Sequence, residues 1–234
     1  MNMKVYASFM MALFLVFSLA WCGTAKNGKS EEAAMTAAPS GASPTASSAA
    51  MTAASPNQTA SGQATVRFDY RTQPGHASNQ FAVWIEDAEG NLVKTLYATR
   101  FTANGGYRNR PDSIFNWVAK SGLADMPKEQ VDAVTGATPQ SGKLVYVWDL
   151  TDDGGNAVPV GGYTFFVEGT MRWKNYVLFS GDIAVGGETA AVTAEPTYYF
   201  EADGGNAALT EDSTETGMLA NVAAEYIPAE SITQ

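Results

Sequence analysis

Hydrophobic and polar side chains alternate in a series of short stretches between residues 65 and 230. In the first stretch, Val66, Phe68 and Tyr70 alternate with charged side chains. A period of two residues is typical of a β-strand with one buried face. Further stretches that predict strands lie at residues 81–86, 92–97, 144–148, 163–168, 176–179, 197–200 and 218–227. Short strands with frequent turn residues between them predict an all-β fold, an Ig-like β-sandwich.

Two connections between these strands carry turn signals. Gly90 and Asn91 supply the positive φ angles that the first hairpin needs. The second connection, residues 149–162, is rich in Asp, Gly and Asn. It begins like an EF-hand calcium loop, but the twelfth position is Val160 instead of Glu. We therefore interpret it as a turn held by Asp and Asn side chains.

One segment departs from the strand pattern. Apolar side chains at positions 114, 117 and 118 repeat with the spacing of an amphipathic helix. Asp112 or Ser113 is a suitable N-cap, and Gly122 is a suitable C-cap. We therefore expect one short helix over about residues 112–121. The aromatic side chains expected in the core of the sandwich are Trp84, Trp148, Tyr163 and Phe165.

Residues 1–21 have the pattern of an export signal. Lys4 makes the start positive, and the apolar run that follows is short for a membrane span but fits a signal peptide. Cys22 comes directly after this run, and the arrangement resembles a bacterial lipoprotein box, which implies a lipid on Cys22. Cleavage after Ala20, giving a soluble secreted protein, remains the alternative. In both cases we expect the protein in the periplasm or cell envelope.

The regions on either side of the strands differ in composition from the folded part. Residues 22–64 are dominated by Ala, Ser, Thr and Pro. Such a stretch buries too little apolar surface to offset its ordering entropy, so we expect a disordered tether. The folded domain is then expected at residues 65–230. Within it, the acidic residues 201–217 are predicted to form a solvated loop that leads to the last strand.

Charge and composition exclude several classes of function. The chain of 234 residues carries a net charge of -10, so it repels phosphate backbones and we expect no nucleic-acid partner. With one Cys and one His, it has no internal disulfide and no Cys/His metal cage. A Cys–His catalytic pair would need Cys22, which belongs to the export signal. We therefore expect neither a catalytic residue nor a metal ligand from these residue types.

The order of several motifs resembles a bacterial family of predicted periplasmic proteins that is described beside flavin-transfer and iron-linked redox genes. The motifs that carry the resemblance lie at residues 83–87, 90, 117, 132–138, 148–149, 152–153, 162–164 and 167–168. Residues 148–163 are also similar to the Ig-like domain of flagellar hook-capping proteins. The second similarity supports a sandwich, but it carries no function, because fold and function are separable.

A narrower resemblance carries chemistry. Residues 132–138 resemble the acceptor sequence of covalent FMN-binding domains, in which a Mg²⁺-dependent flavin transferase joins the FMN phosphate to the hydroxyl of the last Thr. The positions that match this sequence are Asp132, Thr135, Gly136, Ala137 and Thr138. The resemblance implies covalent FMN on Thr138, a flavin transferase as one partner, and membrane-bound redox proteins as others. The membrane itself is expected as a partner through the lipid anchor alone.

The residues of this motif suit such chemistry. A phosphoester needs an accessible hydroxyl, so Thr138 is expected on a loop, and Gly136 lets the backbone approach closely. Asp132 is suited to position a metal–flavin donor, because Mg²⁺ prefers carboxylates and phosphates. The flavin ring needs aromatic neighbours, and Trp117 or Tyr107 lie just upstream. We therefore expect an exported electron carrier and not an enzyme with a substrate pocket.

A simpler interpretation of the same residues remains open. Thr135 and Gly136 can form a turn that Asp132 caps, with Pro139 entering the next strand. The protein would then be a non-redox structural or binding module of an envelope complex.

Overall fold

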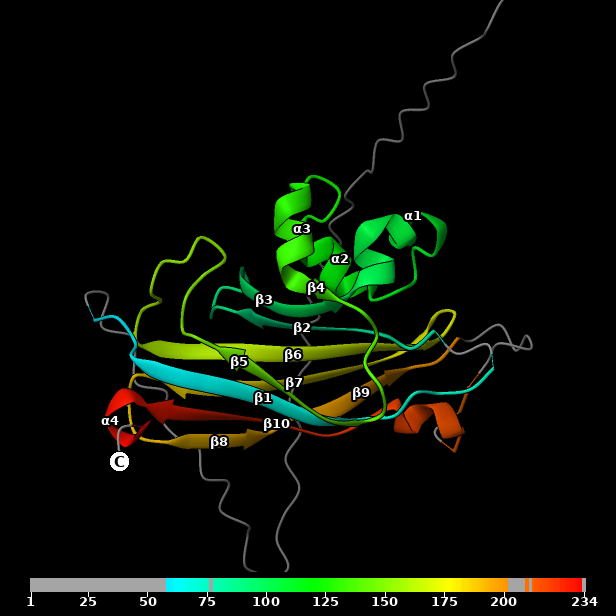
Figure 1. Cartoon of the computed structure of the whole chain (residues 1–234). Helices are drawn as coiled ribbons and strands as arrows, with labels where there is room; N and C mark the ends of the chain where they lie inside the picture. Colours follow the sequence, from blue (N-terminus) through cyan, green and yellow to red (C-terminus); the bar gives the residue numbers. More distant parts are fainter. Residues whose placement is uncertain (1–57, 76–77, 202–208, 211, 233–234) are drawn as a thin grey trace, which may run out of the picture. The chain divides into compact units, whose positions relative to one another are not determined.

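Two β-sheets pack face to face in the folded domain (Figure 1). The structure, a computed structural model, describes residues 58–75, 78–201, 209–210 and 212–232. The strand order of the first sheet is β5 (Gly142–Trp148), β1 (Gly62–Tyr70), β10 (Leu219–Pro228) and β8 (Ala190–Thr193). That of the second sheet is β4 (Thr135–Gly136), β3 (Leu92–Thr99), β2 (Gln80–Glu86), β6 (Gly161–Arg172), β7 (Asn175–Val185) and β9 (Glu195–Tyr199). Neighbouring strands are antiparallel, except that β4 is parallel to β3.

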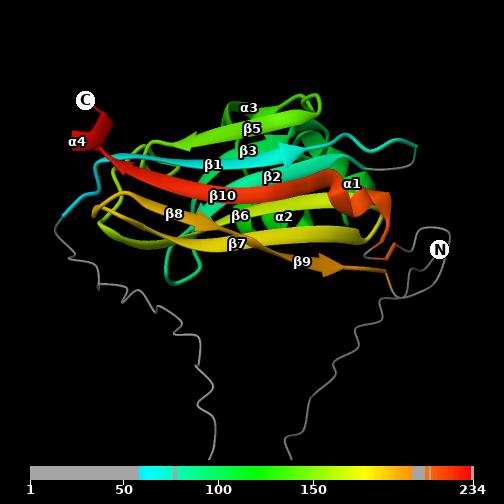
Figure 2. The ribbon, with the colours of Figure 1, turned by 90° about the horizontal axis from the view of Figure 1, so that it is seen from below.

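The all-β sandwich that the alternating pattern predicts is confirmed. The predicted stretches correspond to β1, β2, β3, β5, β6, β7, β9 and β10. Strands β4 and β8 were not predicted, because two and four residues are too few to show an alternation. Viewed from below, the first sheet, with β1, β10 and β8, lies in front of the second sheet, with β2, β6 and β7 (Figure 2).

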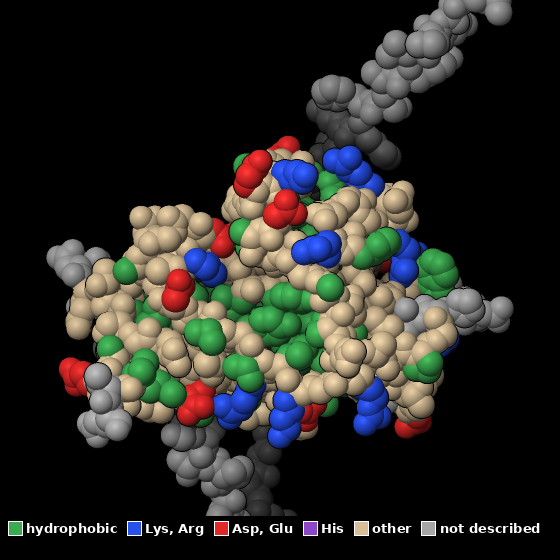
Figure 3. Space-filling model, in the orientation of Figure 1, with side chains coloured by type: hydrophobic (Ala, Val, Ile, Leu, Met, Phe, Trp, Pro, Cys, Tyr) green, Lys and Arg blue, Asp and Glu red, His purple; other side chains and the backbone are tan. Residues whose placement is uncertain are grey.

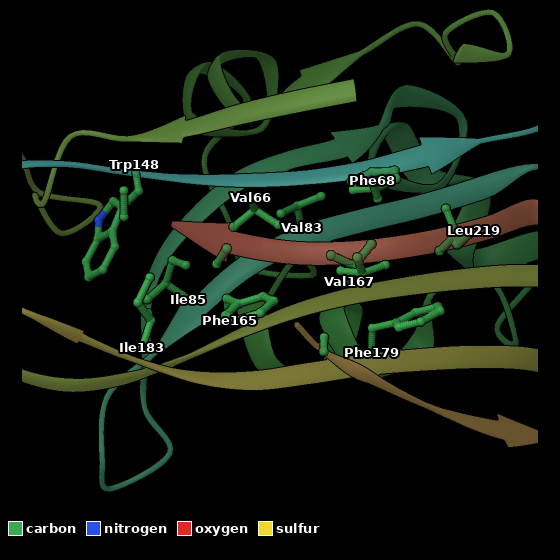
Figure 4. Packing of buried hydrophobic residues seen from close by; sticks show 14 of the residues in the cluster. Val66, Phe68, Val83, Ile85, Trp148, Phe165, Val167, Phe179, Ile183 and Leu219 are labelled. Carbon is green, nitrogen blue, oxygen red and sulfur yellow. The ribbon is translucent and has the colours of Figure 1, made fainter. Parts of the chain in front are cut away.

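The core lies between the inner faces of the two sheets (Figure 4). Val66, Phe68 and Tyr70 of β1 are buried as their alternation predicts, and Trp148 and Phe165 are fully buried in the same cluster. Burial of side chains of this size stabilises the fold by about 1.5–3 kcal/mol each. The packing of β1 against the second sheet is therefore a main source of stability.

A second hydrophobic cluster covers the outer face of the second sheet. Trp84 points away from the sandwich core into this cluster and stacks on Phe166 at 5.0 Å, so its expected place between the sheets is corrected. Strand β2 is buried along its whole length because helices lie on its outer side (Figure 1). These helical segments are η1 (Thr102–Gly106), α1 (Tyr107–Asn109), α2 (Phe115–Ser121) and α3 (Lys128–Val134).

The single predicted helix therefore describes part of a larger helical layer. Helix α2 ends at Gly122 in a left-handed conformation, as predicted. Its expected side-chain N-cap is wrong: Ile114 occupies that position with a φ of 40°, and the Ser113 hydroxyl hydrogen-bonds to the Thr102 hydroxyl at 2.8 Å. Helix α3 was missed because its last residues belong to the segment that we interpreted as a loop.

Both ends of the folded domain are more ordered than expected. Strand β1 begins at Gly62, three residues earlier than the expected boundary, because Ala60 and Ala64 are buried in the core. The acidic segment 201–217 is in part a packed structure: Glu215 lies in the short helix η2 (Thr214–Met218), is 8% exposed and pairs with Arg172. The last described elements are β10 and the short helix α4 (Ala229–Ile232).

Several sequence predictions lie outside the described residues. They are the signal peptide at 1–21, the lipidation of Cys22 and the tether as far as residue 57. Within the described residues, none of the helices has both the length and the apolar character that crossing a membrane requires.

Candidate functional site

The segment that resembles an FMN acceptor, residues 132–138, runs from the helical layer onto the edge of the second sheet. We call it the acceptor segment. Asp132 is exposed on helix α3, whereas its neighbour Val131 is buried against the sheet. The chain then forms β4, in which Thr135 pairs with Ala98 of β3 in parallel register. Asp132 is thus helical, and Thr135 and Gly136 form a strand, so the turn interpretation of these residues is wrong.

Tyr97 of β3 holds the acceptor segment at its centre. Its hydroxyl donates a hydrogen bond to the carbonyl oxygen of Ala137 at 2.7 Å. A Cβ atom on Gly136 would lie 2.7 Å from Cε2 of the Tyr97 ring, closer than real Cβ contacts. Glycine at this position therefore lets the backbone lie directly against the ring, as its expected role in close backbone approach requires.

The two threonines of the acceptor segment differ in their surroundings. Thr138 is exposed and lies in the loop between β4 and β5, which agrees with the accessible hydroxyl expected from the sequence. The Thr135 hydroxyl is buried, and it has no hydrogen-bond partner within the part of the chain that the structure describes. A buried hydroxyl without a partner costs about 1–3 kcal/mol, so its presence needs a reason.

Tyr97 belongs to an aromatic cluster whose other members are Phe68, Tyr70, Phe81 and Tyr146. Tyr97 and Tyr146 are its half-buried members, and their ring centres are 4.9 Å apart. They come from β3 and β5, which approach each other on this flank of the sandwich. Figure 3 shows hydrophobic side chains gathered across the middle of this face, below the helices. We call the two half-buried rings the tyrosine face.

Both phenol groups of the tyrosine face remain protonated at neutral pH. Burial raises the pKa of Tyr97 to about 12, and the nearby Tyr70 adds to the effect. Burial also raises the pKa of Tyr146, with Tyr97 as a further cause. The face is therefore an uncharged aromatic surface beside the acceptor segment.

Trp117, which we expected beside a flavin, has no accessible face. Its ring is fully buried in α2, and its indole nitrogen donates a hydrogen bond to the Thr95 hydroxyl at 3.1 Å. The structure therefore corrects the assignment of Trp117 from a cofactor contact to a core residue. Tyr107 is half-buried and lines a cavity of about 360 Å³ between η1 and α3, together with Arg108 and Lys128.

A buried carboxylate fixes the start of helix α2. Glu168 of β6 accepts hydrogen bonds from the backbone N–H groups of Asn116 at 3.3 Å and Trp117 at 3.0 Å, and from the Asn116 side chain at 3.0 Å. Burial raises the pKa of Glu168 to about 7, although these hydrogen bonds favour its ionised form. The helical layer that leads to the acceptor segment thus rests on a group that titrates near neutral pH.

A comparison with known protein families identifies the family to which the chain belongs. Residues 61–202 match the family described as a predicted periplasmic protein (DUF2271). This chain belongs to that family. No curated protein and no solved structure matches the chain.

The match to the predicted periplasmic family covers the acceptor segment and the tyrosine face. It agrees with the periplasmic location expected from the sequence. Strand β10 lies beyond the matched residues, although it pairs with β1 from Gly62↔Pro228 to Tyr70↔Leu219 in the first sheet. The fold of this member of the family is therefore completed by residues outside the matched range.

At one end of the sandwich, two turns share the same geometry. In the first, Asn91 donates to the Asp87 carboxylate from its backbone at 2.7 Å and from its side chain at 3.0 and 3.2 Å. In the second, Asn156 donates to Asp152 at 2.8, 3.0 and 3.2 Å. The expected turn held by Asp and Asn side chains is confirmed. We call the two turns together the turn end.

The structure thus brings together part of the predicted site. Asp132, Thr135, Gly136, Ala137 and Thr138 lie in one continuous segment from α3 through β4 into the loop. Tyr97 and Tyr146 were missed as site residues. The strand pattern places each on a sheet, but the contact of Tyr97 with Ala137 spans 40 residues, and no local signal shows it.

Proposed function

We propose that this periplasmic protein carries FMN in a phosphoester bond on the Thr138 hydroxyl and relays electrons in the cell envelope. The observation that carries the proposal is the position of Thr138. The residue is exposed on a loop, immediately after a segment that Tyr97 fixes through Ala137. A transferase needs this combination of an accessible hydroxyl and a defined backbone around it.

The residues of the acceptor segment are suited to hold covalently attached FMN. Gly136 leaves no space between the backbone and Tyr97, so the segment has a defined path before Thr138. Thr135 offers a buried hydroxyl without a partner among the described residues, which can gain one when flavin transfer displaces the atoms that cover it. Asp132 is exposed on α3 and available to a metal–flavin donor. When bound, FMN supplies the electron-transfer chemistry, and the protein supplies placement and electrostatics.

The attachment step requires an activated flavin donor, such as a flavin dinucleotide, that carries a leaving group on the flavin phosphate. The Thr138 oxygen forms a bond to the flavin phosphorus, and the bond from that phosphorus to the donor's leaving group breaks. The hydroxyl proton passes to a base on the transferase, because Thr138 has no base among the residues of its own loop. The partners of this function are the flavin transferase and membrane-bound redox proteins.

The proposed anchoring follows from the sequence. A lipid on Cys22 and the tether of residues 22–57 would keep the folded domain near a membrane while letting it reach its partners. Replacement of Cys22 by Ala is then expected to release the protein from the membrane fraction. Recovery of wild-type protein in the soluble periplasmic fraction would support the alternative of cleavage after Ala20.

Co-expression with a flavin transferase tests the flavin proposal. We expect the intact mass of wild-type protein to increase by one FMN residue, and the purified protein to be yellow. The Thr138→Ala variant should show neither change, although its melting temperature should be unaltered because the side chain is exposed. Wild-type protein without added mass contradicts the proposal.

The second candidate function is a non-redox binding module of an envelope complex. It is favoured by Val145 and Val147, which are 59% and 56% exposed on the outer face of the edge strand β5. Exposed apolar side chains on an edge strand are suited to contact a partner. This function predicts a colourless protein in the presence of the transferase, and loss of partner capture when Val145 is replaced by Lys.

A further inference from the structure

The flank of the sandwich beside the acceptor segment exposes aromatic surface. Here β5, the edge of the first sheet, lies next to β3, and the second sheet ends in the two-residue strand β4. Tyr97 and Tyr146 occupy this flank, and each ring rests on Phe81 at 5.1 and 6.3 Å between ring centres. The two rings are therefore held from behind, while their outer surfaces are only half-buried.

The tyrosine face is connected directly to the proposed attachment point. The Tyr97 hydroxyl contacts the carbonyl of Ala137, and Thr138 is the next residue, one step of about 3.8 Å along the chain. The ribityl phosphate arm of FMN is longer than one such step. The arm is therefore long enough for a flavin ring attached at Thr138 to reach Tyr97, and Tyr146 is in contact with Tyr97.

We propose that the isoalloxazine ring of FMN on Thr138 packs against Tyr97 and Tyr146. The inference rests on the proposed function and adds to it the binding surface of the cofactor. A flat, largely apolar ring gains from contact with uncharged aromatic rings. The Phe81 ring and the hydrogen bond to Ala137 fix Tyr97 before the flavin arrives, so little ordering is needed on contact.

Two other aromatic positions are less suited to the ring. Trp117 is fully buried, so contact with it would require opening of the helical layer. Tyr107 lines the cavity between η1 and α3 and has Arg108 above its ring at 5.5 Å, which occupies one face. Tyr107 therefore provides a matched control, since it is a half-buried tyrosine of the same domain whose hydroxyl accepts a hydrogen bond from Arg108 instead of donating one to Ala137.

Flavin fluorescence distinguishes these positions. Tyrosine in van der Waals contact with an excited flavin quenches it by electron donation, whereas phenylalanine does not. We therefore replace tyrosines by Phe, which keeps the ring and preserves packing. Each variant is loaded by co-expression with the transferase. Loading is measured by intact mass, and fluorescence yield and lifetime are measured per bound flavin.

The expected result is weak fluorescence for loaded wild-type protein and a several-fold increase per bound flavin for the Tyr97→Phe/Tyr146→Phe double variant, which lacks both quenching rings. Each single variant should increase the yield by a smaller factor, and Tyr107→Phe should leave it unchanged. The inference is overturned, with the proposed function intact, when FMN is present but the double variant has the wild-type yield, or when Tyr107→Phe alone changes it. Absence of FMN mass on wild-type protein overturns both.

Discussion

The turn end and the acceptor segment are both polar, Gly-containing segments that begin with an aspartate, yet they are organised in opposite ways. In the turn end, Asp87 and Asp152 direct their carboxylates inward to Asn91 and Asn156. In the acceptor segment Asp132 and Thr138 point to solvent, and the Thr135 hydroxyl is buried without a partner among the described residues.

This difference separates structural from functional polar residues. A turn that satisfies its own hydrogen bonds needs nothing further and stabilises the hairpin. The acceptor segment is instead fixed from outside, by Tyr97, and leaves the Asp132 carboxylate and the Thr138 hydroxyl exposed.

The supports of the two regions also differ in how they titrate. In the turn end, burial raises the pKa of Asp87, but hydrogen bonds from Asn91 outweigh this effect and lower the pKa. Glu168 supports the helical layer that leads to the acceptor segment, and burial raises its pKa to about 7.

The largest expected effect concerns Glu168. The folded protein holds a proton on Glu168 between its ordinary pKa of 4.5 and about 7, so the free energy of unfolding falls as pH rises through this window. At about 1.4 kcal/mol per pH unit, the loss is about 3 kcal/mol. Urea unfolding should show this decrease in wild-type protein and a flatter profile in Glu168→Gln. The same dependence of unfolding free energy on pH in both proteins would show that Glu168 does not have a raised pKa.

The next effect concerns Gly136. In Gly136→Ala the new methyl group meets the Tyr97 ring, displaces it and breaks the hydrogen bond to Ala137. We expect a loss of about 2 kcal/mol in the free energy of unfolding, as for other overpacked sites, and reduced flavin loading. Gly187→Ala is the matched control, because a Cβ there meets no atom within 4 Å. Unchanged loading in Gly136→Ala would show that Tyr97 does not need to hold the segment.

A smaller effect is expected in the turn end. Asp87→Ala removes the acceptor of three hydrogen-bonding contacts from Asn91, at a cost of about 1.5 kcal/mol after allowance for solvent exposure. Asp152→Ala should act in the same direction. Flavin loading per folded molecule should remain at the wild-type level in both variants, as measured by intact mass. Loss of loading here would remove the distinction between the two regions.

The smallest effect concerns Thr135. Thr135→Val removes the buried hydroxyl without a partner and keeps the shape of the side chain. We expect the free energy of unfolding to rise by up to about 1 kcal/mol, and the rate of flavin loading to fall. Chemical denaturation and a time course of loading measure the two quantities. A less stable variant would indicate that the hydroxyl has a partner in solution and is structural.

The strands could be predicted because their signal is local. Val66, Phe68 and Tyr70 alternate within a few residues, and such alternation requires no knowledge of distant contacts. The acceptor segment could be located in the same way, as a short motif. Its support could not, because Tyr97 and Ala137 meet across 40 residues.

The errors have the same origin. Trp117 lies near the motif in sequence, which suggests a contact with the flavin, but α2 turns it onto the second sheet. Local sequence suggests Asp112 or Ser113 as the N-cap of α2, whereas the Trp117 N–H donates to Glu168, 51 residues away. Local pattern thus predicts elements, and tertiary contacts decide which side chains remain available for function.

The most direct test locates the flavin within the acceptor segment. Trypsin should cleave loaded protein after Lys128 and Lys143 and release a peptide of residues 129–143, which contains Thr135, Thr138 and Ser141 as its hydroxyl side chains. Fragmentation of this peptide should place the FMN mass on Thr138. An FMN mass on Thr135 or Ser141, or an unmodified peptide from protein exposed to an active flavin transferase, would contradict the account.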